Sequence, residues 1–478
     1  MSLSMKNLPK NRLLLLSGII VLSTVFLFLR IRTLGHLLMW DEAWNVLSLR
    51  AYLAKAAQDP FYWYYSFHPP LYMFFASLLS PFKAGFGVRA ETLSLLFSYG
   101  SFLAAIGISF RLGGRRYALL TGFFLCLLPL SLGYDTWIKR DSLAVFLGYS
   151  SLLLALYNRP FPGAFTLGLS LLSKESGLFF VPAFFFTVLM GPGNGKRFFT
   201  AGLSAVIITA VSAWWYIGFS NLSGRIADFY FNSSIYGSAW AEPFHYYASK
   251  LLYDAGIPAL IFFASGLCSL LYFSRAKGRY DLLIPLIVFF SVFLPASFAF
   301  STKTPWLSYS LGPAIAMIAA SGAHFALGRS YGNRFLRGGV FVVLFLAAVQ
   351  GVSFNYTSYL KNTCPKGWPG AKVSRDLAMY LNSRMRPEDK LMLSDFAYWN
   401  MPVCPVFFYY WDKHPVIMFS GKESAEDILL KAKENNVTWL AVASSPDPSH
   451  NYDPLIAELS SLLGRRPEQA GWTFVWNL

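Results

Sequence analysis

The sequence predicts an α-helical polytopic membrane protein with a C-terminal α/β domain. Two observations support this fold class. Of the 478 residues, 55% are hydrophobic and only 13% are charged, whereas soluble domains contain about a quarter charged residues. Uncharged apolar runs recur from residue 13 to residue 355 and then stop. We therefore divide the chain into a membrane domain, residues 1–360, and a soluble domain, residues 361–478.

The apolar runs of the membrane domain predict about eleven transmembrane helices, since a helix needs about 20 residues to cross the hydrocarbon of a bilayer. The first run follows three basic residues, as in a signal peptide, but no small-x-small cleavage pattern comes after it, so we expect an uncleaved anchor. Residues 69–82 are short and flanked by proline, which favours an interfacial or re-entrant helix. The eleven runs lie near residues 13–29, 90–110, 117–134, 141–157, 162–173, 176–190, 198–219, 252–273, 282–300, 306–327 and 336–355.

Basic residues in the short loops predict the orientation, because Lys and Arg collect on the cytoplasmic side of a membrane. With the N-terminus in the cytoplasm, the inner loops carry almost only basic residues, and Asp281 is the one acid among them. The other ten acids of the membrane domain then fall on or near the outer side. We therefore expect a multi-pass plasma-membrane protein whose first outer loop, residues 30–89, and C-terminal domain lie outside the cytoplasm.

Residues 361–478 predict a small α/β domain, because β-rich apolar runs alternate with helical patterns. The domain holds 13 basic and 13 acidic residues, so the positive charge of the chain lies in the membrane part and a nucleic-acid partner is not expected. Cys364 and Cys404 could form a disulfide outside the cytoplasm, and two free thiols are the alternative. Strands are expected at 390–394, 415–420, 438–444 and 472–476, and helices at 372–383, 424–436 and 452–463.

The best candidates for catalysis are the adjacent acids Asp41 and Glu42 in the first outer loop. The helical pattern after them has an aromatic-rich face suited to the membrane surface. Partial burial at such a surface would raise a carboxyl pKa toward that of a general base. The alternative is an N-terminal helix cap, a position that Asp and Glu also favour.

Two pairs of opposite charges lie near the outer ends of predicted spans: Arg140 with Asp141, and Lys174 with Glu175. The apolar run before Lys174 would rise only about 18 Å as a helix, so this pair is expected below the outer surface. Charges at membrane depth are costly and usually functional. The alternative is a snorkelling pair whose members only satisfy each other.

Lys303 lies at the outer end of a predicted span beside Trp306 and Tyr309, where it could hold a phosphate or act as an interfacial anchor. His68 precedes two prolines that fix a rigid entry into the next helix, and a turn within an aromatic belt is the alternative. The six histidines do not have the HExxH spacing of metal ligands, so zinc is not expected.

In their order along the chain, these motifs resemble those of the GT-C membrane glycosyltransferases. The similarity is to the group that uses polyprenyl-phosphate sugars, which contains protein O-mannosyltransferases and the lipid A aminoarabinose transferase. The matching pieces cover roughly residues 35 to 313. They are DEAW, HPPLY, LGGRRY, KRDSLAVF, GLSLLSKESGLFFVP, and KTPWLSY followed by GP.

The resemblance implies a GT-C fold and an inverting transfer of a sugar from a polyprenyl-phosphate donor to an acceptor hydroxyl on a protein, lipid or glycan at the outer face. It implies Asp41 as the general base and Glu42 as a substrate or metal contact, which leaves a divalent cation open. It assigns donor phosphate binding to Arg140, Lys174, Lys303 and Tyr309. It assigns substrate binding to His68, Asp141 and Glu175.

A transporter or lipid flippase is the main alternative from another class, because it would also have many spans and buried charges. Transporters commonly show inverted repeats and binding sites at the midplane, whereas the charges here gather at the outer ends of spans. A non-catalytic membrane assembly or sensor would leave the paired acids unexplained. The sequence therefore favours a glycosyltransferase.

Overall fold

The computed structural model divides the chain into two compact units, residues 1–35 with 52–363 and residues 36–51 with 364–478. Residues 36–51 thus group with the C-terminal unit, and the division at residue 360 stays a prediction. The two units are considered separately. The residues whose structure is described are 8–35, 42–43, 45–49, 69–78, 86–191, 196–218, 243–300, 305–330, 333–355, 369–394, 405–411, 416–419, 423–443, 452–470 and 473–478.

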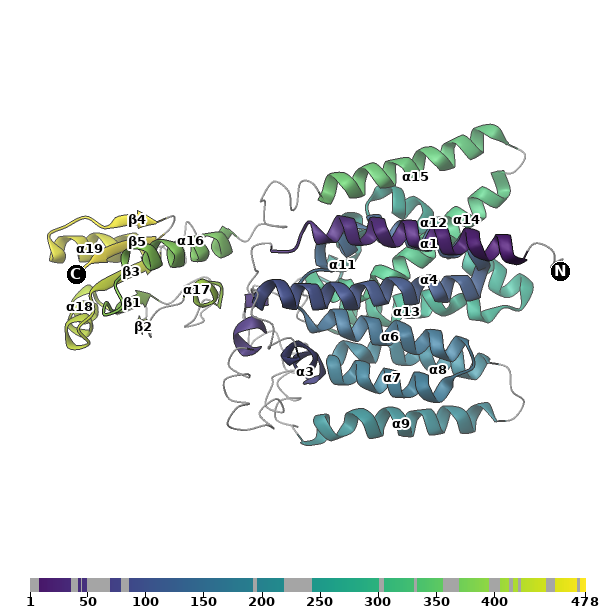
Figure 1. The fold of residues 1–478 in the computed structure, drawn as a ribbon, viewed down its shortest axis with the longest axis horizontal. Coiled ribbons are helices and arrows are strands. Elements are labelled where there is room, and N and C mark those ends of the chain that lie inside the picture. The colour runs from purple at the N-terminus through teal and green to yellow at the C-terminus, as the bar shows by residue number, and fades with distance from the viewer. Residues whose placement is uncertain are drawn as a thin grey trace. The chain divides into compact units, whose positions relative to one another are not determined.

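The first unit is a bundle of helices that run side by side and alternate in direction (Figure 1). Short 3-10 segments (η3, η6, η8) and one π-helical segment (η7) lie at helix ends. In chain order the elements are α1 (Leu8–Ile31), α3 (Leu71–Ser77), α4 (Phe86–Leu127), α5 (Pro129–Tyr134), α6 (Arg140–Leu156), α7 (Pro160–Ser173), η3 (Glu175–Phe180), α8 (Val181–Met190), α9 (Arg197–Gly218), α11 (Tyr246–Ala255), α12 (Ile257–Lys277), η6 (Tyr280–Leu283), α13 (Ile284–Leu294), η7 (Pro295–Ala299), η8 (Pro305–Leu311), α14 (Gly312–Arg329) and α15 (Arg334–Asn355).

Within the described residues, seven helical segments are long and apolar enough to cross a membrane, so this is a multi-pass membrane protein. α6 and α7 have only 17 and 14 residues. The α3 helix has seven, which rise about 10 Å and cannot cross the hydrocarbon. The number of about eleven crossings stays a prediction, although each of the eleven predicted runs overlaps described helical segments.

The long helix α4 is a hairpin that turns at Gly114. This glycine has a φ of 79°, a backbone region that side chains with a Cβ rarely adopt. Ser109 Oγ and Thr121 Oγ1 lie 2.8 Å apart, whereas 12 residues of straight helix would separate them by about 18 Å. The two arms of α4 are therefore antiparallel, as expected from the separate apolar runs at 90–110 and 117–134.

Helices α12 and α14 pack closely, and their backbones touch at two glycines. A Cβ at Gly266 would lie 1.9 Å from the Ile318 carbonyl oxygen, and a Cβ at Gly322 would lie 2.0 Å from the Phe262 carbonyl oxygen. Small residues permit this close approach of helices in membranes. Every residue from 307 to 320 is buried, so η8 and the first half of α14 form part of the core.

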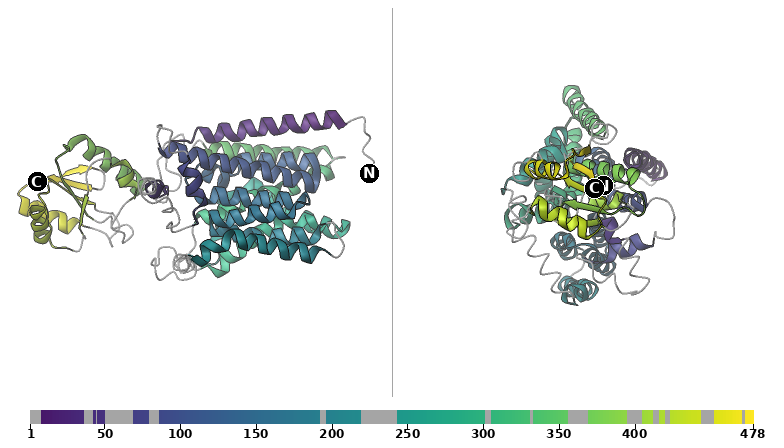
Figure 2. Two further views of the ribbon diagram at one scale, coloured as in Figure 1. Left: turned by 60° about the horizontal axis from the view of Figure 1, so that its bottom comes forward. Right: turned by 90° about the vertical axis from the view of Figure 1, so that its left-hand side faces the viewer.

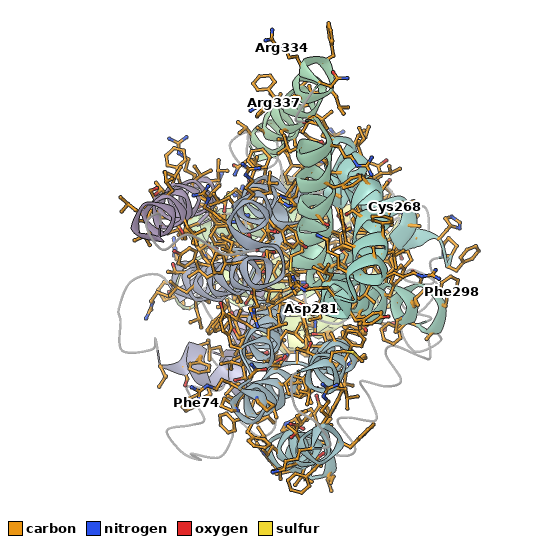
Figure 3. All side chains as sticks on the ribbon, turned by 90° about the vertical axis from the view of Figure 1, so that its right-hand side faces the viewer. Phe74, Cys268, Asp281, Phe298, Arg334 and Arg337 are labelled. Atoms are coloured by element: carbon orange, nitrogen blue, oxygen red, sulfur yellow. The ribbon has the colours of Figure 1, made fainter. Side chains whose placement is uncertain are left out.

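The turns of the bundle fall at two ends that differ in charge, and we name them the basic end and the acidic end. The basic end, where α1 begins, faces the viewer in Figure 3. Its described cations include Arg111, Arg115, Arg116, Arg159, Lys196, Arg197, Arg275, Lys277, Arg279, Arg329, Arg334 and Arg337, and its only described acid is Asp281. The acidic end, where α1 ends, holds the other described acids of the bundle, Glu91, Asp135, Asp141, Glu175 and Asp254, together with the described cations Arg30, Arg32, Arg89, Lys139, Arg140, Lys174 and Lys250.

The second unit contains a five-stranded mixed sheet in the order β2-β1-β3-β5-β4, and helices flank this sheet (Figure 2). This confirms the predicted α/β domain. Two short elements, β4 and α17, were not predicted, because three to six residues are too few to show a period. The strands are β1 (Leu391–Ser394), β2 (Val416–Phe419), β3 (Trp439–Ala443), β4 (Glu468–Ala470) and β5 (Thr473–Asn477), and the helices are α16 (Pro369–Arg384), α17 (Pro405–Tyr410), α18 (Ala425–Glu434) and α19 (Asp453–Leu463).

The strand directions and the apolar core identify the layers of this unit. β1 pairs in parallel with β2 and β3, whereas β5 runs antiparallel to β3 and β4. Helices α18 and α19 pack on one face of the sheet through Ile428 and Leu459, against Met392, Leu440 and Trp476. The unit thus has its own hydrophobic core.

Candidate functional site

Six charged side chains at the acidic end of the bundle are buried and form three ion pairs. Each of their side chains is 7% exposed or less. Burying an ion costs several kcal/mol, which close pairing and additional hydrogen bonds offset. The three pairs are Lys174 with Asp141, Arg30 with Asp135, and Lys250 with Asp254.

The first pair joins the two charged motifs predicted from the sequence. Lys174 caps α7 in an extended conformation, and its Nζ donates to both carboxylate oxygens of Asp141 at 2.8 Å. Asp141 lies in the first turn of α6. One residue before Lys174, the Ser173 hydroxyl donates to the carbonyl oxygen of Arg140 at 3.1 Å. The ends of α6 and α7 are therefore fastened at two adjacent points, and Arg140 is held beside the ion pair.

The glycine of the motif SKESG allows the chain to return against α7 after Lys174. A Cβ at Gly177 would lie 2.8 Å from the Leu171 backbone nitrogen and 2.8 Å from the Ser170 carbonyl carbon. The Ser170 hydroxyl also donates to the Ala144 carbonyl oxygen of α6 at 2.7 Å. Glu175 begins the returning segment η3 and is half-buried. This short motif therefore supplies a cation, an acid and the close packing that positions both.

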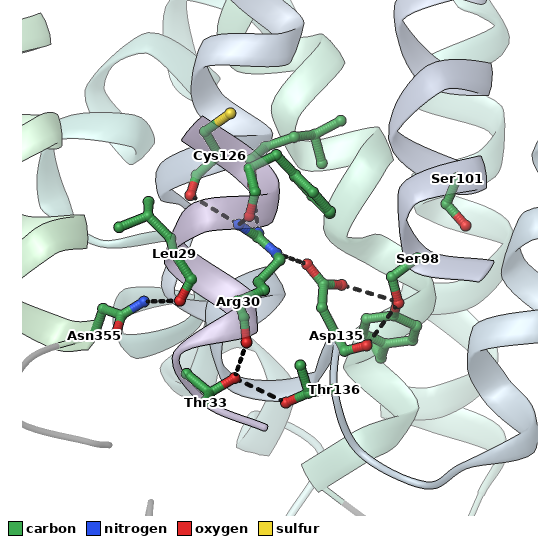
Figure 4. Close-up of polar contacts among 12 residues, drawn as sticks. Leu29, Arg30, Thr33, Ser98, Ser101, Cys126, Asp135, Thr136 and Asn355 are labelled. Carbon is green, nitrogen blue, oxygen red and sulfur yellow. Dashed lines mark hydrogen bonds and ion pairs between the residues drawn. The ribbon is translucent and has the colours of Figure 1, made fainter. Parts of the chain in front are cut away.

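The second pair anchors the end of α1 (Figure 4). Arg30 is fully buried, and its Nε donates to Asp135 Oδ2 at 2.5 Å. Its other guanidinium nitrogens donate to the carbonyl oxygens of Phe26, Leu125 and Cys126. Arg30 thus satisfies carbonyl groups from α1 and from the end of α4, in addition to neutralising Asp135.

The Asp135 carboxylate also holds Tyr309, one of the predicted phosphate-binding residues. The Tyr309 hydroxyl donates to Asp135 Oδ1 at 3.0 Å, and the Ser98 Oγ lies 2.8 Å from the same hydroxyl. Ser98 in turn donates to the Asp135 carbonyl oxygen at 3.0 Å. In this structure the Tyr309 hydroxyl therefore points to protein partners, and its contact with a phosphate stays a prediction.

The third pair lies within α11, where Lys250 Nζ is 2.5 and 2.6 Å from the two carboxylate oxygens of Asp254. Two of the three pairs bond to η8, and Tyr149 of α6 adds a third bond, so three successive residues of η8 are held by three different parts of the chain. These bonds run from the Ser308 hydroxyl to Asp254 Oδ2 at 2.8 Å, from the Tyr309 hydroxyl to Asp135 Oδ1 at 3.0 Å, and from the Tyr149 hydroxyl to the Ser310 carbonyl oxygen at 3.2 Å.

Arg30, Asp135, Lys250 and Asp254 were not predicted as site residues from the sequence. Arg30 and Asp135 are 105 residues apart, so no local pattern links them. The i,i+4 spacing of Lys250 and Asp254 is the signal that could have identified the third pair. This spacing was overlooked because the predicted apolar run, residues 252–273, begins inside α11 and includes Asp254.

The predicted site residues differ in how far the structure describes them. Asp141 and Lys174 are in contact, and Arg140, Glu175 and Tyr309 lie at the same end of the bundle. Glu42 is fully buried and belongs to the second unit. Among the described residues, no group of three His, Cys, Asp or Glu side chains is placed to hold a metal ion. The predictions for Asp41, His68, Lys303, Cys364 and Cys404 fall outside the described residues.

Comparison with known proteins gives matches at the level of structure. No family model and no curated protein matches the sequence. The fold is similar to that of ArnT from Cupriavidus metallidurans, solved bound to undecaprenyl phosphate, with a TM-score of 0.64 and 16% sequence identity over 96% of this chain and 97% of ArnT. The apo state of the same protein gives a TM-score of 0.62.

Two further solved structures share this architecture. The archaeal oligosaccharyltransferase AglB from Archaeoglobus fulgidus, in complex with an inhibitory peptide and a dolichol-phosphate, has a TM-score of 0.60 at 13% identity, over 90% of this chain and 69% of AglB. The mycobacterial arabinofuranosyltransferase AftD has a TM-score of 0.51 at 14% identity, over 90% of this chain and 37% of AftD. The chain therefore has the GT-C fold that the order of its motifs predicts.

Proposed function

We propose that this protein is a membrane glycosyltransferase that moves a sugar from a polyprenyl-phosphate donor to an acceptor hydroxyl. The observation that carries the proposal is the group of buried, paired charges at one end of a GT-C bundle. Charges at such depth are functional by default. The fold of ArnT, which was solved with undecaprenyl phosphate, supports the choice of donor.

In the proposed reaction, the donor phosphate is the leaving group and is held by cations. Negative charge grows on this phosphate as its bond to the sugar breaks, so fixed cations stabilise the transition state. We assign this role to Arg140, Lys174 and Lys303, with Tyr309 as a further phosphate contact. The 2.8 Å bonds from Lys174 to Asp141 fix the direction of the ammonium group before the donor arrives.

Asp41 is the proposed general base. It takes the proton of the acceptor hydroxyl while the hydroxyl oxygen attacks the anomeric carbon from the side opposite the phosphate, and the configuration inverts. Glu42 is proposed as a substrate or metal contact. His68, Asp141 and Glu175 are proposed to bind the substrates, and the acceptor is a protein, lipid or glycan.

We propose that the basic end faces the cytoplasm and that the acidic end and the C-terminal domain lie outside the plasma membrane. The distribution of described cations supports this orientation through the positive-inside rule. Nucleotide sugars are made in the cytoplasm, so an enzyme with an outer site needs a donor carried by a lipid. This explains why a phosphate site would lie at the acidic end.

The test of this proposal is sugar transfer by purified protein in lipid nanodiscs. Asp41→Asn keeps the shape of the side chain but cannot accept a proton, so we expect transfer from a polyprenyl-phosphate sugar to fall by a factor of about 10² or more. The variant should elute as a monodisperse peak and unfold at the wild-type temperature. Full turnover by a correctly folded variant would contradict the role of Asp41.

A further inference from the structure

An apolar groove lies on the side of the bundle between α1, the second arm of α4, and α15. Val21 of α1, Phe123 of α4 and Leu344 of α15 contribute to its three walls. Its volume of about 460 Å³ falls in the range of ligand pockets. The groove contains none of the residues assigned to sugar transfer, so it is a separate feature of the molecule.

The lining of the groove suits hydrocarbon and not a polar ligand. Ser17 is the only lining residue with a polar side chain, and its hydroxyl donates to the Leu14 carbonyl oxygen one turn earlier in α1. α1 approaches α4 closely at Gly18, where a Cβ would lie 2.7 Å from the Leu119 side chain. Gly18 and Leu119 both line the groove, so this contact joins two of its walls.

Helices α4 and α15 both line the groove. Nearer the basic end, the same faces of these two helices carry arginines. Residues four or seven positions apart lie on the same face of an α-helix. These arginines are Arg115 and Arg116, four residues before Leu119 and Leu120, and Arg337, seven residues before Leu344.

Positive charge dominates at this end of the groove. Asp281 is the only acid described at the basic end, and its carboxylate already bonds to Arg279 at 2.6 Å. Arg116 and Arg337 are exposed, and Figure 3 shows Arg337 projecting from α15 at the edge of the bundle. A ligand that fits both parts must therefore combine a hydrocarbon chain with an anionic group at its end.

We propose that this groove binds one anionic phospholipid from the membrane leaflet at the basic end. One of its acyl chains fills the groove, and its phosphate lies against the arginines. Guanidinium groups bind phosphate through two parallel hydrogen bonds, and basic pockets between transmembrane helices recognise anionic head groups. A zwitterionic lipid also brings a phosphate, but it places its own cation near three arginines and so binds more weakly. The lipid links α1 and α15 to the body of the bundle.

Competitive lipid retention, measured by native mass spectrometry, tests the site. Wild-type protein is purified from mixed micelles with equal amounts of phosphatidylglycerol and phosphatidylcholine of the same acyl chains. We expect a preference for phosphatidylglycerol that falls by roughly tenfold or more in the combined variant Arg115→Gln, Arg116→Gln and Arg337→Gln. Val21→Phe, which narrows the groove, should lower retention of both lipids.

The matched control removes three charges from the same end of the bundle at Arg159, Lys196 and Arg197, each changed to Gln. These residues lie at the ends of α7 and α9, across the bundle from α1 and α15 (Figure 1). The control should keep the preference of the wild type. Equal retention of both lipids by the wild type, or equal loss in the two triple variants, would overturn the proposal. Replacement of the bound lipid by added undecaprenyl phosphate at equal concentration would also overturn it, because the groove would then be a donor site.

Discussion

The ion pairs at the two ends of the bundle differ in how far their side chains are exposed. At the acidic end, the side chains of Arg30 and Asp135 are 0% and 5% exposed. At the basic end, those of Arg279 and Asp281 are 44% and 32% exposed. An exposed pair contributes at most about 1 kcal/mol, whereas a buried charge is tolerated only with a well-placed partner. The exposed pair at the basic end therefore adds little stability, whereas the buried pairs at the acidic end require defined positions of individual atoms.

The largest effect is expected when Asp135 is removed. Asp135→Ala leaves the fully buried Arg30 without its acid and the Tyr309 hydroxyl without its acceptor. Breaking a buried pair in this way costs about 3–5 kcal/mol, which should appear as a large drop in the thermal unfolding temperature in detergent. The double variant Arg30→Met with Asp135→Leu should recover much of this stability but not sugar transfer. If the double variant is fully active, the pair does not position η8.

The next effect is on catalysis and concerns Lys174. Lys174→Met keeps the length of the side chain and removes the cation, so we expect the kcat/KM for the polyprenyl-phosphate donor to fall by about 10²–10³-fold. Lys174→Arg keeps the charge and should retain more activity than Lys174→Met. Steady-state kinetics at fixed acceptor concentration measures this order. Equal activity of the two variants would mean that the charge at this position does not act on the donor.

A smaller effect is expected at Ser308, which links η8 to the third ion pair. Ser308→Ala removes one hydrogen bond to Asp254 and should cost about 1 kcal/mol of stability. Because it loosens η8, it should also raise the KM for the donor more than it lowers kcat. The control is Ser330→Ala at the basic end, where the hydroxyl donates to a carbonyl oxygen of its own turn, that of Leu327. The control variant should leave the KM unchanged. An equal change of KM in Ser308→Ala and Ser330→Ala would show that the two ends do not differ in their effect on donor binding.

The smallest effect is expected at the exposed pair of the basic end. Arg279→Gln breaks its bonds to Asp281, yet the unfolding temperature should change by no more than the equivalent of about 1 kcal/mol. This small effect should shrink further in 1 M salt, where exposed charges are screened. A loss of stability as large as that of Asp135→Ala would show that the two ends do not differ as described.

Much of the fold could be predicted because the apolar runs and the basic turns are local signals. The turn LGGRRY was expected between two spans, and Gly114 with its positive φ forms the tip of the α4 hairpin. The break between α11 and α12 was not expected. Gly256, with a φ of 78°, ends α11 just where an apolar run would continue, so the run alone did not reveal the amphipathic helix before it.

The candidate site could be predicted only in part. Arg140, Asp141, Lys174 and Glu175 were identified as charges near the outer membrane boundary, and they do lie at one end of the bundle. The partner of Lys174 could not be predicted, because Asp141 is 33 residues away and Glu175 is its neighbour in sequence. The packing of α6 against α7 decides this choice, and packing between helices leaves no short-range pattern in a sequence.

The most direct test of the account is the lipid that the purified protein retains at the acidic end. Polyprenyl phosphate bound to wild-type protein, to Lys174→Met and to Arg279→Gln is quantified by mass spectrometry after purification from the same membranes. We expect wild type and Arg279→Gln to retain equal amounts and Lys174→Met to lose most of this lipid. No polyprenyl phosphate on the wild type, or equal amounts on all three proteins, would contradict a donor site built from the buried charges.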